Sequence, residues 1–340
     1  MSKNNLRNVR GEHPLKTSPI VKGIVLRDAR GITLQRSMVA VTRGEENGRF
    51  TKGKIMIPDS RFLNLPKNFW ANVRLIGQEV GYTIRGEGIV KIPSLHEIRG
   101  AFNKIGLGTS QLADSEGNLT VLGTTLIDYF EYRAKLLNDY VEPRLMDAKE
   151  AELLYNKIKQ ESQPKCPLPM NKQKGEKKKP AFLTGIINML IEKHSSVASC
   201  DYDPRVLTTI TMDWQPVRTL SRRIDGAFPS AINPIAVWEI KEYYYTTTFG
   251  SRIADGVYES LLDGMELEEL TINVGIEVKH YLMVDAYYTW WKCGKSYLCR
   301  IIDMMHMGYL DEVLFGKETI ERLPDLVASW VKILEEKNAL

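Results

Sequence analysis

The chain has 340 residues, of which 43% are hydrophobic, and it carries a formal net charge of +4. A chain of this size can hold two domains, because single cores stop growing at about 250 to 300 residues. No stretch approaches the roughly 18 consecutive apolar residues of a membrane-spanning helix, and the first residues, MSKNNLRNVRGEHPLK, are polar and basic. The sequence therefore predicts a globular, soluble protein of the cytoplasm with no membrane partner.

The cysteines and histidines give no support for a zinc site or a disulfide framework. The four cysteines contain no CxxC pair, and the five histidines stand far from one another. We expect reduced, mostly structural thiols at Cys166, Cys200, Cys293 and Cys299.

The positive charge is concentrated at the start of the chain. Residues 1–100 carry a net charge of +10, whereas residues 101–340 carry −6. A basic N-terminal third suits contact with a polyanion, because neutralising phosphates releases counterions. A solvated basic surface is the other interpretation of the same charge.

The first 123 residues are predicted to form a basic, β-rich (α+β) domain that recognises DNA. Between Ile20 and Ile92 short apolar runs such as GIVL, SMVAVT and ANVRLIG are bounded by turn residues, which favours strands over helices. A short helix follows, with Ser94 as its N-cap and Gly106 as its stop.

Residues 124–180 are predicted to form a helical connector and a linker. The apolar spacing between Thr125 and Gln160 indicates a long helix that Pro143 should kink or split. The segment from Gln163 to Pro180 has four prolines and six lysines with little to bury, so we expect an exposed linker there.

Residues 181–340 are predicted to form an α/β domain with a mixed β-sheet flanked by helices. The expected order in this half is a helix, two strands, a helix, a strand and C-terminal helices. These elements are expected at residues 181–193, 218–228, 235–245, 251–269, 278–290 and from Ser296 onward.

Two acids and a lysine stand out within the expected pair of strands. Side chains alternate along a strand, so Glu239 and Lys241 share one face, about 6 to 7 Å apart at the backbone. If the preceding run pairs with this strand, Asp225 lies beside Glu239. The alternative is a cross-strand ion pair of about 0.2 to 1 kcal/mol.

A divalent cation would explain why two carboxylates are held close together. Mg²⁺ prefers oxygen ligands, so Asp225, Glu239 and the backbone carbonyl of Ile240 are the predicted metal ligands. Lys241 would orient a water molecule or help it lose a proton, and would stabilise charge on the pentacovalent phosphorane formed by in-line attack.

The pattern D-x13-E-x-K at Asp225, Glu239 and Lys241 resembles the active site of the PD-(D/E)xK nuclease superfamily, and type II restriction endonucleases in particular. The order of helix, acid-bearing hairpin, helix and strand is similar too, although Ile224 stands where the family name has proline. The resemblance implies a restriction-endonuclease-like fold. It also implies Glu192 as an auxiliary catalytic acid on the preceding helix, for which an exposed glutamate beside Lys193 is the alternative.

Polar residues around the triad are predicted to contact the DNA backbone. Packing or exposure to solvent is the alternative for each of them. The candidates are Arg222, Arg223, Tyr243, Thr247, Ser251 and Arg252.

The sequence thus predicts a Mg²⁺-dependent endonuclease that cleaves double-stranded DNA at a specific sequence, with Asp225, Glu239 and Lys241 as its catalytic residues. Cutting both strands of a palindromic site is most simply done by a homodimer. A repair or modification-dependent nuclease of the same fold, and a DNA-binding protein without catalysis, are the two alternatives.

Overall fold

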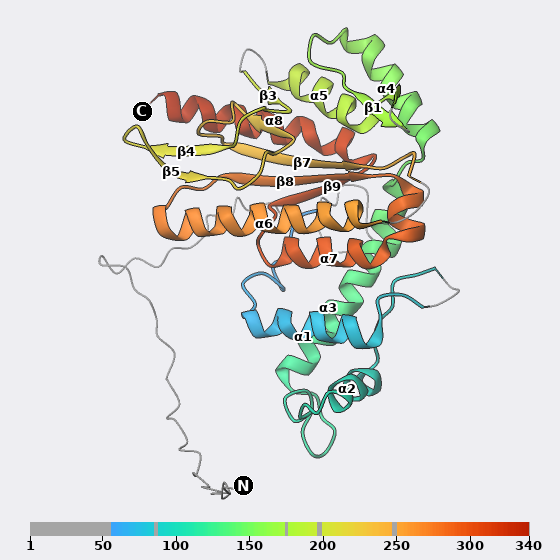
Figure 1. The fold of residues 1–340 in the computed structure, drawn as a ribbon. Helices are drawn as coiled ribbons and strands as arrows, with labels where there is room; N and C mark the ends of the chain where they lie inside the picture. The colour runs from blue at the N-terminus through green and yellow to red at the C-terminus, as the bar shows by residue number, and fades with distance from the viewer. Residues whose placement is uncertain (1–55, 85–87, 174–175, 196–198, 247–249, 340) are drawn as a thin grey trace, which may run out of the picture. The chain divides into compact units, whose positions relative to one another are not determined.

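The computed structural model describes residues 56–84, 88–173, 176–195, 199–246 and 250–339 (Figure 1). The apolar runs between residues 20 and 55, which we expected to be strands, lie outside the described residues. No helix within the described ranges has both the length and the apolar character needed to cross a membrane.

A mixed sheet of five strands forms the centre of the described chain. Its order is β3-β6-β7-β8-β9, with β6 antiparallel to both β3 and β7, and with β7, β8 and β9 parallel. The strands are β3 (Asp201–Tyr202), β6 (Gly226–Phe228), β7 (Ala236–Glu242), β8 (Lys279–Asp285) and β9 (Glu312–Phe315).

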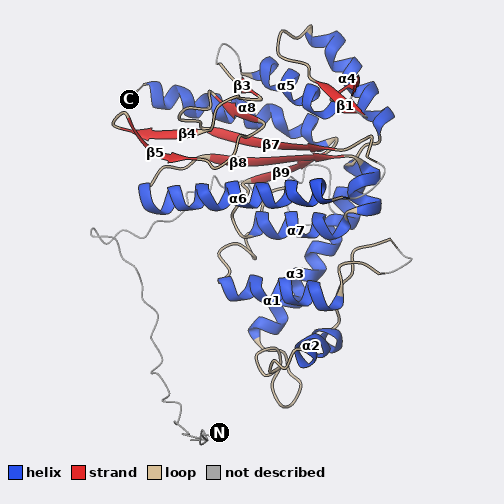
Figure 2. Cartoon of the chain, in the orientation of Figure 1, coloured by secondary structure: helices blue, strands red, loops and turns tan. Residues whose placement is uncertain are grey.

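Helices cover both faces of this sheet, as the sequence predicted for residues 181–340 (Figure 2). The helices α5 (Phe182–His194) and α8 (Glu318–Asn338) lie over one face, and α6 (Ser251–Val274) and α7 (Lys295–His306) lie over the other. Because successive side chains of β7 point to opposite faces of the sheet, they contact the two helical layers in turn. Trp238 stacks on Trp330 of α8, whereas Val237 packs with Leu267 of α6.

The helix α5 lies within one residue of its predicted bounds at each end. The helix α6 begins at Ser251 as predicted but runs five residues past its predicted end, to Val274, where Gly275 with a φ of 78° ends it. The long helix predicted between Thr125 and Gln160 breaks as expected. Around Pro143 the long helix splits into α3 (Val121–Lys135), a π-helical turn at Leu136–Val141, a 3₁₀ turn at Glu142–Arg144 and α4 (Ala148–Ser162).

The expectation of a β-rich N-terminal domain is wrong for the described residues 56–84 and 88–123. They form two helices, α1 (Lys67–Val80) and α2 (Leu95–Lys104), and their only strand-like pairings are isolated bridges. The run ANVRLIG lies inside α1, where the buried side chains recur every three or four residues as on one helical face. Ser94 caps α2 as predicted, in a capping box with Glu97.

Four further segments differ from their prediction. The expected linker contains an antiparallel hairpin of β1 (Met170–Gln173) and β2 (Glu176–Pro180). The expected strand at residues 278–290 ends at Asp285, and a π-helical turn follows at Tyr288–Cys293. The short strand β9 was not expected, nor was the hairpin of β4 (Thr209–Met212) and β5 (Gln215–Thr219) in this form.

The described residues belong to one compact unit. One hydrophobic cluster joins residues of α1, α2 and α3 to residues of β8, α7 and β9. The boundaries that we predicted after residues 123 and 180 fall within this unit.

Candidate functional site

The hairpin of β6 and β7 places Asp225 opposite Glu239. Gly226 pairs with Trp238 in the antiparallel register, so the next residue back along the chain, Asp225, lies across from Glu239. The carboxylate of Asp225 accepts a hydrogen bond from the backbone N–H of Ile240 at 2.8 Å. Glycine is needed beside it, because a Cβ at Gly226 would lie 2.2 Å from the Trp238 ring.

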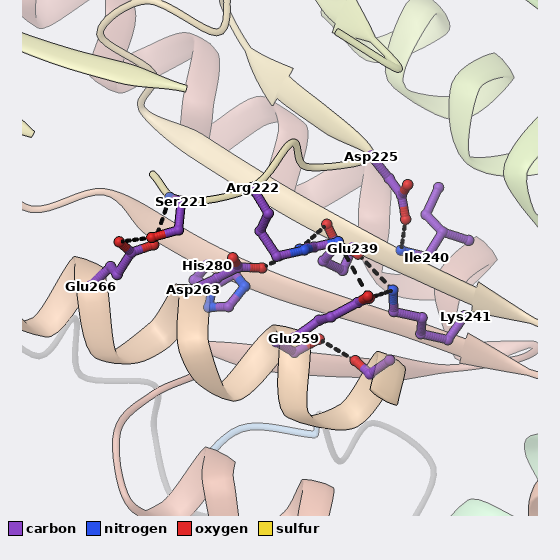
Figure 3. A network of polar contacts seen from close by, with 12 residues as sticks. Ser221, Arg222, Asp225, Glu239, Ile240, Lys241, Glu259, Asp263, Glu266 and His280 are labelled. Carbon is purple, nitrogen blue, oxygen red and sulfur yellow. Dashed lines mark hydrogen bonds and ion pairs between the residues drawn. The ribbon is translucent and has the colours of Figure 1, made fainter. Parts of the chain in front are cut away.

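Glu239 and Lys241 lie on the same face of β7, toward α6 (Figure 3). The Lys241 Nζ donates to Oε2 of Glu239 at 2.7 Å. Glu239 is fully buried and Lys241 is only 8% exposed. Gly256 of α6 leaves room for the lysine side chain, because a Cβ there would lie 3.1 Å from the Lys241 methylenes.

A guanidinium group closes the network from the other side. Arg222 binds both carboxylate oxygens of Glu239, at 2.8 and 3.2 Å. The same group contacts Asp263 at 2.5 Å and Glu259 at 3.4 Å. Glu259 also accepts from Lys241 Nζ at 3.1 Å, so α6 is tied to both cations.

Sequence analysis missed the two acids that α6 contributes. Glu259 and Asp263 are four residues apart on a helix and therefore lie on one face. That spacing is visible in the sequence, but only the packing of α6 against β7 shows that this face meets Arg222 and Lys241 (Figure 3).

The network contains more negative than positive groups. When all are ionised, four carboxylates face two cations, which leaves two negative charges without a partner. The carboxylates are Asp225, Glu239, Glu259 and Asp263, and the cations are Arg222 and Lys241.

The excess of carboxylates and their burial shift the pKa values of the site. Burial, with the charge of Glu239, raises the pKa of Asp225 to about 7. Burial likewise raises the pKa of Asp263 to about 7, against the pull of Arg222. Burial alone would raise the pKa of Glu239, but Lys241 and Arg222 outweigh this effect and lower the pKa.

Lys241 stays charged in this setting. Burial alone would lower its pKa, but the charges of Glu239 and Asp225 raise it above the ordinary value. The side chain therefore offers ammonium protons rather than an acceptor for a proton.

The oxygen atoms at this place suit a hard divalent cation. In a strand the N–H and C=O of one residue point to the same edge, so the Ile240 carbonyl lies at the edge where Asp225 sits. Nearby, Oδ1 of Asp263 is buried without a hydrogen-bond partner. Among the described residues no group of three or more His, Cys, Asp or Glu is arranged to hold a metal. The candidate set is two carboxylates and one carbonyl.

Glu192 does not join the network. It lies near the C-terminal end of α5, and its carboxylate accepts from the backbone N–H of Lys165 at 3.0 Å. The N-terminal end of α5 instead meets Glu242, which accepts from the N–H of Thr184 at 3.0 Å. The structure therefore gives no contact with the network that would support Glu192 as an auxiliary catalytic acid.

The residues that were predicted to contact DNA differ in their exposure and in their partners. Arg222 is bound by three carboxylates, so its guanidinium group is not free for phosphates as we expected. The ring of Tyr243 packs on Trp290 at 5.8 Å rather than facing outward. Arg223 and Ser251 are exposed. Thr247 lies outside the described residues, as does the side chain of Arg252.

Comparisons with known proteins give two family matches. Residues 146–330 match the family described as Domain of unknown function (DUF7687), and residues 56–140 match the one described as Domain of unknown function (DUF7690). No curated protein and no solved structure matches the chain. The two matches meet between residues 140 and 146, where the 3₁₀ turn precedes α4.

Proposed function

The chain belongs to the DUF7687 family, and we propose that it is a Mg²⁺-dependent endonuclease that hydrolyses phosphodiester bonds of double-stranded DNA at a specific sequence. One observation carries the proposal. Asp225 lies opposite Glu239 on neighbouring strands, and Lys241 contacts Glu239 from two residues along the same strand. The order α5, β6–β7 hairpin, α6 and β8 resembles the order of the PD-(D/E)xK nucleases, so we propose a restriction-endonuclease-like fold.

Asp225, Glu239 and the carbonyl of Ile240 would hold the magnesium ion. When bound, Mg²⁺ lowers the pKa of a coordinated water and neutralises charge on the phosphate. Arg222 keeps the Glu239 carboxylate in one orientation through two hydrogen bonds. The two negative charges in excess are the charge that one divalent cation would balance.

Lys241 would donate hydrogen bonds to the attacking water and to the phosphate oxygens. Its raised pKa supports this role, because a permanently charged ammonium stabilises negative charge that develops in the transition state. The net charge of +10 in residues 1–100 supports a polyanionic substrate such as DNA.

Plasmid cleavage tests the proposal. We expect discrete fragments with Mg²⁺, none with EDTA, and a loss of about 100-fold or more in Asp225→Asn, Glu239→Gln and Lys241→Met. Asp255→Asn is the matched control, an exposed acid on α6 outside the network, and should cut normally. Fragments that persist in EDTA or in Asp225→Asn would refute the assignment, and a smear would indicate a less selective nuclease.

A DNA-binding protein without catalysis is the second candidate. It is favoured by the fact that Arg222 and Lys241 already pair both oxygens of Glu239, so the network is connected without a cation. Gel-shift and cleavage assays on the same DNA separate the two functions. Binding that needs no Mg²⁺, with no cutting under any condition, would support this candidate.

A further inference from the structure

Four large apolar side chains are exposed on the outward face of α6. Tyr258, Leu262, Met265 and Ile272 are 48%, 43%, 50% and 70% exposed. The outward face of a surface helix normally carries polar and charged residues. Single exposed apolar side chains are ordinary, whereas four on one face of a single helix, interrupted by Glu269, form a strip that favours a partner.

The spacing of this strip suits another helix. With Glu269 included, the positions 258, 262, 265, 269 and 272 follow one another in alternate steps of four and three. A repeat that averages 3.5 residues keeps one seam facing a partner helix along its length. The seam spans 15 residues, so its ends lie about 21 Å apart at the rise of an α-helix.

We propose that α6 pairs in antiparallel fashion with α6 of a second copy of this chain. A two-fold axis midway between Asp263 and Gly264 exchanges position 262 with 265, and position 258 with 269. Each Leu262 then meets Met265 of the partner subunit, so the apolar centre of the seam complements itself.

The ends of the seam complement each other in charge. Arg300 of α7 donates to the Tyr258 hydroxyl at 2.6 Å, which places a guanidinium group beside one end. Glu269 lies one step before the other end, Ile272, and its side chain is 57% exposed while it pairs with Arg218. The two-fold axis sets Glu269 of each copy against the Tyr258 and Arg300 end of the other. The seam positions carry a carboxylate and no cation, so a polyanion does not suit them.

This pairing leaves the ion network outside the seam. Glu259 is three residues from seam position 262, which is about 60° around the helix, and Asp263 is one residue from it, which is about 100°. Two copies joined along α6 would therefore hold their two ion networks in fixed positions relative to each other. Cutting both strands of DNA in this arrangement rests on the proposed function, whereas the pairing itself does not.

Sedimentation velocity of the full chain, without DNA or metal, tests the pairing. At about 50 µM we expect a species of twice 38.8 kDa, and a dissociation constant raised about tenfold or more in Leu262→Glu with Met265→Glu. Leu153→Glu is the matched control, a 72% exposed leucine on α4, and should leave the dimer unchanged. A monomeric wild type, or a dimer that the double variant forms equally well, overturns the proposal.

Cysteine cross-linking tests the antiparallel register with milder changes. In a Cys293→Ser background, which removes the exposed native thiol, a mixture of Leu262→Cys and Met265→Cys chains should form a disulfide-linked pair on mild oxidation. Each variant alone should link several-fold less, since identical positions lie apart in this register. Efficient linking of Leu262→Cys to itself would indicate parallel helices and overturn the register. Because neither experiment uses DNA, a failed dimer and a failed nuclease are distinguished.

Discussion

Two of the buried ion networks among the described residues hold helices in place and differ in their charge balance. Arg133 of α3 binds Asp303 of α7 at 2.8 and 3.0 Å, and the Tyr129 hydroxyl adds a third bond to the same carboxylate. One cation meets one anion there. Around Glu239, by contrast, four carboxylates share two cations.

The difference is that one network balances its own charges and the other does not. A buried pair with equal and opposite charges satisfies itself and has no need of a ligand. A buried group with excess negative charge is unfavourable alone, and its acids take up protons, as the raised pKa values of Asp225 and Asp263 show. We expect the Glu239 network to gain stability when a cation binds, whereas the Arg133 pair does not require one.

Breaking the balanced pair should have the largest effect on stability. Asp303→Ala leaves the Arg133 guanidinium buried and unpaired, because Arg133 is only 2% exposed. We expect the free energy of unfolding to fall by about 3 to 5 kcal/mol, measured by urea denaturation. The double variant Arg133→Met with Asp303→Leu should recover much of this loss. A single variant as stable as the wild type would show that the pair is not structural.

Neutralising Asp263, one acid of the unbalanced network, should raise the free energy of unfolding rather than lower it. The folded chain holds the Asp263 proton up to about pH 7, whereas the unfolded chain releases it near the ordinary value of 3.8. The folded state therefore binds more protons between these pH values, and this group makes stability fall as pH rises through the window.

Asp263→Asn removes that dependence. We expect the variant to gain about 2 kcal/mol over the wild type above pH 7 and almost nothing near pH 4, in urea denaturation at both values. Asn273→Ala, an exposed change on the same helix that alters no charge, should give the same difference at both pH values. A variant less stable than the wild type above pH 7 would mean that Asp263 is needed as an ion-pair partner.

Sequence patterns predicted those parts of the site that depend on one strand or one turn. Alternation alone put Glu239 and Lys241 on one face, and the turn after Asp225 suggested the hairpin. The roles of Arg222 and Asp263 could not be predicted, because they depend on how α6 packs against β7. The helix α1 was mistaken for strands because its apolar runs were judged in short pieces, although Phe69, Trp70, Val73 and Ile76 fit one helical face.

Magnesium should distinguish the two networks directly. If Mg²⁺ binds with a dissociation constant of about 1 mM, a concentration of about 10 mM stabilises the folded chain by about 1.4 kcal/mol. We expect a rise in melting temperature for the wild type and none for Asp225→Asn or Glu239→Gln. The Arg133→Met, Asp303→Leu variant should keep the full rise, because its change lies in the other network. A rise of equal size in Asp225→Asn would place the cation elsewhere.

The smallest effect is expected at the solvent edge of the unbalanced network. Glu259 has a side chain that is 43% exposed, and its contacts with Lys241 and Arg222 are 3.1 and 3.4 Å long. Exposed ion pairs contribute little, so Glu259→Gln should change the free energy of unfolding by less than about 1 kcal/mol. The change should shrink further in high salt, which screens exposed charges first. A loss comparable to that of Asp303→Ala would mean that α6 is held by this contact, and that the two networks share a structural role.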